Sequence, residues 1–150
     1  MSVAKLLLSS EGRIGRRTWL LFVVAVLTLY FAALGAAMVV NGLDLALDRD
    51  IYWLGPGFMI VASYPAFCVN AKRFQDRGKG RWWALAATVT DLAVVVVDVL
   101  FLLRGDVGPI LEWSVNAPAY AVMVWFFVEL GCLRGTPGEN RYGSDPLAGS

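Results

Sequence analysis

Apolar residues fall into four long runs that are separated by short polar segments. The runs are 18–40, 51–71, 82–103 and 110–133. Each is long enough to cross a bilayer as a helix, which needs about 20 residues. We expect helices because a lipid-exposed backbone must satisfy its own hydrogen bonds, and because the runs lack the alternation of barrel strands. The pattern predicts an all-α polytopic membrane protein with four transmembrane helices, forming a single domain over residues 1–150 with a tail at 134–150.

Basic residues are concentrated in alternate connecting segments. The N-terminal segment, the loop between the second and third runs, and the tail contain every lysine and arginine except Arg49 and Arg104. Short loops rich in lysine and arginine lie on the cytoplasmic side of membrane proteins. We therefore expect an N-in, C-in topology, in which both termini and the middle loop are cytoplasmic.

The composition excludes several classes of protein. Hydrophobic residues make up 58% and charged residues 17% of the chain, whereas a soluble domain has roughly 45–50% and 25%. So small a soluble domain cannot bury this much apolar side chain, which argues against a soluble enzyme. Histidine is absent, and the two cysteines, Cys68 and Cys132, lie inside apolar runs. We expect no metal and no cofactor, because two isolated thiols do not complete a zinc site.

A cluster of cations, which we call the basic belt, flanks the ends of the first three runs near Trp19, Trp82 and Trp83. Its members are Arg13, Arg16, Arg17, Lys72, Arg73, Arg77, Lys79 and Arg81. Guanidinium groups match phosphate geometry, and tryptophan favours the headgroup level, so the belt suits anionic lipid or phosphate. The alternative interpretation is that these charges only fix topology. Asp76, which lies among them, is expected to hold an arginine in place.

Carboxylates inside the third and fourth runs are the second candidate site. Asp91 lies nine residues beyond Trp82, roughly 13–14 Å along a helix and near the middle of the bilayer. It shares a helix face with Asp98, and a second polar stripe begins at Glu112 and includes Asn116. We expect these stripes to face each other, with Arg49 or Arg104 as a counter-charge. They form either a proton or cation path, or polar contacts that fix helix packing.

Smaller features give further expectations. The triplet at 55–57, Gly-Pro-Gly, is expected to break or delay the second helix. Glu129 is expected to reach towards Arg134. The tail contains turn-forming residues and is expected to fold back onto the basic belt, with Glu139 or Asp145 pairing there.

Three boundary segments, 12–19, 72–83 and 138–146, have an order and spacing that resemble a family of small bacterial inner-membrane proteins, domain of unknown function 805. The resemblance covers nearly the whole chain. It implies a four-helix, multi-pass protein of the bacterial inner (cytoplasmic) membrane and no particular activity. The family's middle loop usually reads Arg-Leu-His-Asp, whereas this chain has Gln75 in place of the histidine. Glutamine keeps a hydrogen-bonding role but cannot titrate.

The patterns favour a protein that is not an enzyme. Asp91 and Asp98 are about 10 Å apart along one helix, too far for an aspartic dyad, and no nucleic-acid-binding module surrounds the basic belt. We therefore expect an interaction or scaffold protein of the inner membrane that binds anionic lipid headgroups or a membrane protein partner, and no nucleic acid. The alternative is a transporter or channel component with a path along Asp91 and Asp98, which requires a homo-oligomer because four helices leave little room for a pore.

Overall fold

The computed structural model describes residues 2–40, 53–104 and 109–147, and this part of the chain is helical without a β-strand. The helices are α1 (Val3–Leu8), α2 (Arg16–Val40), α4 (Leu54–Asp76), α5 (Trp82–Arg104) and α6 (Pro109–Phe127), and α6 continues into a π-helical turn, η1 (Val128–Cys132). Four helical segments are long and apolar enough to cross a membrane, which confirms the predicted fold class.

Several boundaries differ from those that hydropathy predicted. Helix α4 continues to Asp76, so the basic motif of the middle loop is helical. At its other end α4 begins at Leu54, and the triplet at 55–57 lies in the first turn instead of interrupting the helix. Pro56 is tolerated there because the first N–H groups of a helix have no intrahelical acceptor. Hydropathy gave no indication of the short helix α1 or of the π-helical turn.

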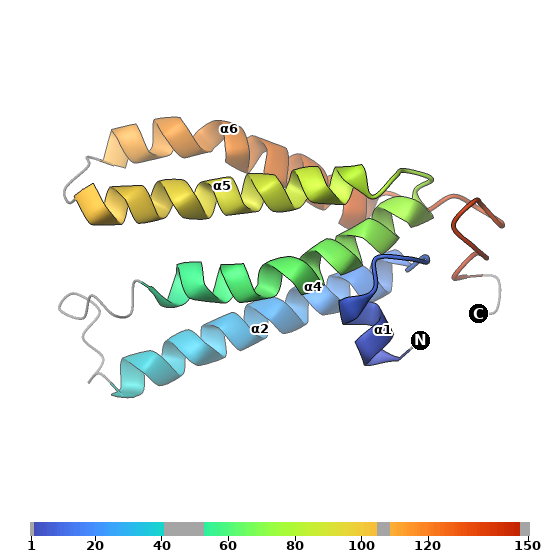
Figure 1. Ribbon diagram of the computed structural model, residues 1–150, viewed down its shortest axis with the longest axis horizontal. Helices are drawn as coiled ribbons and strands as arrows, with labels where there is room; N and C mark the ends of the chain where they lie inside the picture. Colours follow the sequence, from blue (N-terminus) through green and yellow to red (C-terminus); the bar gives the residue numbers. More distant parts are fainter. Residues whose placement is uncertain (1, 41–52, 105–108, 148–150) are drawn as a thin grey trace.

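Figure 1 shows two helix pairs, α2 beside α4 and α5 beside α6, joined through contacts between α4 and α5. Helix α4 is central, because it also contacts α1 and η1. Both chain termini and the turn between α4 and α5 lie at the same end of the bundle (Figure 1). We call this the termini end.

Buried apolar residues gather towards the termini end, where Trp19, Phe74, Phe126 and Leu130 belong to one cluster. The Trp19 indole is 5% exposed and its N–H donates to the Asn70 side chain at 2.8 Å. Gly131 lies against this ring, since a Cβ placed there would come within 2.9 Å of the indole. Elsewhere the long helices expose large apolar side chains, as a lipid environment requires.

Candidate functional site

The three segments that carry the sequence motifs meet at the termini end. Arg13, which precedes α2, donates from Nε to Asp76 Oδ1 at the end of α4, at 3.1 Å. Its terminal nitrogens donate to tail carbonyls, those of Thr136 at 2.7 Å and Gly138 at 2.6 Å. We call the contacts that Arg13, Lys72, Arg73 and Asp76 make with one another and with the terminal segments the polar clasp.

Asp76 is the carboxylate at the centre of the polar clasp. It is 3% exposed and forms ion pairs with Arg13 and with Arg73, one helical turn back on α4. The expected role of Asp76 as an internal partner for arginine is confirmed. The tail passes directly over it, because the backbone N–H of Thr136 donates to the Asp76 carbonyl at 2.8 Å and Gly135 leaves no room for a side chain beside the carboxylate.

Arg73 joins α4 to the end of the last helix. Its side chain is fully buried, and its nitrogens donate to the carbonyls of Leu130 at 2.7 Å and Leu133 at 2.5 Å. The last carbonyls of a helix have no intrahelical donor. Arg73 therefore supplies donors to the C-terminal end of η1 while its charge is balanced by Asp76.

Lys72 supplies hydrogen-bond donors to the C-terminal end of α1, as Arg73 does for η1. Its fully buried ammonium donates to the carbonyls of Lys5 at 2.9 Å, Leu6 at 2.7 Å and Ser9, which matches the three donors that an ammonium has. These carbonyls lie at the C-terminal end of α1, so a lysine in the middle of the sequence caps the N-terminal helix.

Gln75 stands where the resemblance implies histidine. Its side-chain nitrogen donates to the Ser10 carbonyl at 2.9 Å, and its own main-chain carbonyl accepts from Asn140 at 3.0 Å. Its Oε1 is buried with no hydrogen-bond donor among the residues that the structure describes. Residue 75 therefore has a structural role in this protein, because it links α4 to both terminal segments.

Glu129 does not approach Arg134 as the sequence suggested. It is buried in η1 and accepts from Arg77 Nε at 3.1 Å and Lys79 Nζ at 2.6 Å, both near the turn between α4 and α5. The expectation was wrong because Arg77 and Lys79, which are distant in the sequence, lie against Glu129 in the folded chain. The Lys79 ammonium also lies 5.1 Å from the centre of the Trp83 ring, close enough for a cation–π contact.

The tail folds back as predicted, but through main-chain groups more than through carboxylates. Asp145 accepts from the backbone N–H groups of Leu147 at 2.9 Å and Gly138 at 3.0 Å, and these two hydrogen bonds lower the pKa of its carboxyl below the usual value. Glu139 is exposed. Most tail contacts of Arg13 are made by carbonyl oxygens, a kind of acceptor that a sequence pattern does not reveal.

The basic belt separates into groups with different surroundings. Lys72, Arg73 and the Arg13 side chain are buried, and Arg77 and Lys79 are partly buried beside Glu129. Three members are exposed, and their side chains form no hydrogen bond or ion pair to another described residue; these are Arg16, Arg17 and Arg81.

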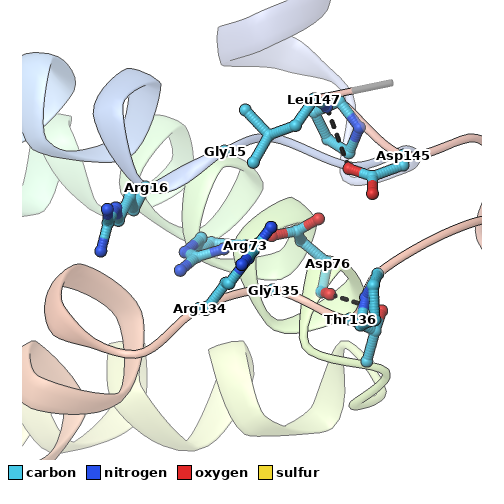
Figure 2. Close-up of a pocket in the computed structure, with 11 residues that line it drawn as sticks. Gly15, Arg16, Arg73, Asp76, Arg134, Gly135, Thr136, Asp145 and Leu147 are labelled. Carbon is cyan, nitrogen blue, oxygen red and sulfur yellow. Dashed lines mark hydrogen bonds and ion pairs between the residues drawn. The ribbon is translucent and has the colours of Figure 1, made fainter.

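A cavity of about 210 Å³ lies within the polar clasp. Figure 2 shows Arg16, Arg73 and Arg134 around it, with the carboxylates of Asp76 and Asp145 also in its wall. Since Arg73 already has Asp76 as its partner, the cavity leaves Arg16 and Arg134 as the guanidinium groups available to an added anion.

The carboxylates inside the membrane lie partly where the sequence predicted them. Asp98 on α5 accepts from the Asn116 amide on α6 at 2.9 Å, so the two polar stripes face each other. Asp91 is half-buried and shares its helix face with the buried residues Ala87 and Val94. Arg104 is exposed and forms no ion pair within the described part of the chain, whereas Arg49 and the Glu112 side chain lie outside it.

Fold and site define a class of protein, an α-helical integral membrane protein whose two terminal segments are held on the end of one central helix. Among the described residues, no group of three or more His, Cys, Asp or Glu side chains is placed to hold a metal ion.

Comparison with known proteins assigns the family. The chain matches the family described as "Protein of unknown function (DUF805)" over residues 7–144, and it belongs to this family. It is 29% identical to the uncharacterized protein YiiR of Escherichia coli K12, over 97% of this chain and 90% of that protein. It is 27% identical to the inner membrane protein YhaI of the same strain, over 100% and 96%. No solved structure matches the chain. The protein is therefore a multi-pass inner-membrane protein.

Proposed function

We propose that this protein is a non-enzymatic interaction protein that binds anionic phospholipid headgroups through the exposed arginines of the basic belt. The observation that carries the proposal is the contrast within the belt. Five cations are placed against internal acceptors, whereas Arg16, Arg17 and Arg81 are exposed without one in the described structure. Their positions beside Trp19 and Trp82 match the headgroup level of a bilayer.

Helix dipoles support the same assignment. Arg16 and Arg17 open α2, and Arg81 immediately precedes α5, and neither helix has an acidic residue in its first turn. A cation at a helix N-terminus opposes the macrodipole, whereas a phosphate there is favoured by both the free N–H groups and the arginines. An anionic headgroup thus offsets the repulsion that the sequence builds into these two helix starts.

Charge distribution also gives the proposed orientation. The termini end holds the N-terminal segment, the turn between α4 and α5, and the tail (Figure 1), and these contain most of the lysines and arginines. By the positive-inside rule this end faces the cytoplasm, and the headgroups belong to the inner leaflet. Near an anionic surface each such residue contributes about 1 kcal/mol.

The test is binding of purified protein to lipid nanodiscs that differ only in anionic phosphatidylglycerol content. We expect Arg17→Gln and Arg81→Gln each to weaken the preference for phosphatidylglycerol several-fold. The control is Arg104→Gln, which removes the same charge from an exposed arginine at the other end of α5. It should leave the preference for phosphatidylglycerol unchanged. Equal lipid preference in all three variants contradicts the proposal.

A transport or channel role for Asp91 and Asp98 stays a prediction. The hydrogen bond between Asp98 and Asn116 supports the packing role for Asp98, because it joins two helices within one chain.

A further inference from the structure

An apolar groove of about 550 Å³ runs along the bundle between α2 and α4. Its walls come from one face of α2 between Thr18 and Leu29 and from α4 between Phe58 and Pro65. Three residues of α1, Val3, Leu6 and Leu7, complete it. Because its walls are apolar and its helices span a membrane, the groove opens to lipid and not to water.

Helix α1 is a fixed wall of this groove. Lys72 holds the carbonyls at the end of α1, and the Tyr64 hydroxyl donates to the Leu8 carbonyl at 3.2 Å. The groove is therefore bounded at the termini end by a helix that the polar clasp keeps in place.

The depth of the groove matches one leaflet. From Thr18 to Leu29 is eleven residues, about 16 Å along a helix, and half of the hydrocarbon core is about 15 Å. A helix from another protein would cross the whole core and is about 10–12 Å wide. A single acyl chain that enters from one leaflet fits this depth better.

Arg17 stands at the mouth of the groove. It lies four residues before Leu21 and eight before Ala25, both of which line the groove, so it shares their helix face. Side chains on a helix lean towards its N-terminus, which places the exposed guanidinium beyond the apolar wall at the headgroup level. The charge above the groove is positive, so it complements an anionic headgroup.

We propose that the groove is a specific site for one anionic glycerophospholipid, whose acyl chain lies between α2 and α4 while its phosphate meets Arg17. The inference rests on the proposed function and deepens it by naming the lipid class and the place that it occupies.

The test is native mass spectrometry of protein extracted in mild detergent, with identification of the lipids that remain bound. Ala25→Trp fills the groove, and Val61→Trp is a second variant at a lining residue whose side chain is 79% exposed. We expect wild type to retain one phosphatidylglycerol or related anionic lipid per chain, and both variants to lose it. Ala93→Trp, on an exposed position of α5, is the matched control and should retain the lipid.

Retention of the lipid at wild-type stoichiometry in Ala25→Trp and Val61→Trp overturns the inference. If these variants retain the lipid while Arg17→Gln still weakens anionic preference in nanodiscs, the groove is not the site but the proposed function stands. If Arg17→Gln and Arg81→Gln both leave the lipid preference in nanodiscs unchanged, the proposed function itself fails.

Discussion

Arg13 and Asp76 are 63 residues apart in the sequence, yet their side chains form an ion pair of 3.0 Å and are only 1% and 5% exposed. This pair joins the segment before α2 to the end of α4, and Arg13 extends the connection to the tail carbonyls of Thr136 and Gly138. The arginine thus links both terminal segments to the central helix.

Replacing Asp76 with asparagine should destabilise the protein by roughly 3–5 kcal/mol, because it leaves two buried guanidinium groups without their carboxylate. The readout is the free energy of unfolding in detergent, from denaturant titration. Asp145→Asn, at a partly buried tail carboxylate that forms no ion pair in the described structure, is the control and should cost much less. A loss of less than about 1 kcal/mol in Asp76→Asn would show that the pair contributes little.

Replacing Lys72 with methionine should release α1 without unfolding the bundle. Hydrogen bonds to a charged group contribute about 1.5–3 kcal/mol each, so loss of even one raises local opening about tenfold or more. The measurement is amide hydrogen exchange of residues 3–10. Lys5→Met makes the same chemical change on α1 itself, where the side chain is exposed, and should leave exchange unchanged. Equal protection in both variants would exclude a capping role for Lys72.

Asp98 and Asn116 should be energetically coupled. A double-mutant cycle with Asp98→Ala and Asn116→Ala is expected to give a coupling of roughly 0.6–1.7 kcal/mol, between the average and the maximum for hydrogen bonds between membrane helices. The same cycle with Asp91→Ala should give a value near zero, because Asp91 lies two turns away on α5. A larger coupling energy with Asn116 for Asp91 than for Asp98 would contradict the packing role assigned to Asp98.

The tail should loosen in acid. Hydrogen bonds from the N–H groups of Leu147 and Gly138 lower the pKa of Asp145 in the folded protein, whereas the unfolded value is about 3.9. The stabilisation is therefore present above about pH 4 and is lost as the pH falls through the lower, folded pKa. We expect hydrogen exchange of these two amides, corrected for the intrinsic pH effect, to rise below about pH 4, and Asp145→Asn to remove this dependence. An unchanged profile in Asp145→Asn would assign the transition to another group.

Hydropathy and charge, read from the sequence, predicted the four spans and the concentration of cations in alternate segments. They also identified Asp76 as a partner for arginine. These predictions succeed because a helix in lipid must form its own backbone hydrogen bonds and expose apolar side chains. Both requirements act on the local sequence. The polar clasp was harder to predict from the sequence, because Lys72, Arg73 and Arg13 bind main-chain carbonyls of distant segments. Every residue carries a carbonyl, so the sequence does not mark which ones serve as acceptors.

The sequence by itself therefore determined that this is a membrane protein with four spans, and it placed most of the cations in the segments that flank those spans. Only the tertiary structure decided which of those cations are internal and which face outward, because that depends on where the chain ends and the π-helical turn come to lie. Glu129 shows the reason most directly. Its carboxylate pairs with Arg77 and Lys79, which come from the segment around the turn between α4 and α5, and no local pattern in the sequence specifies that contact.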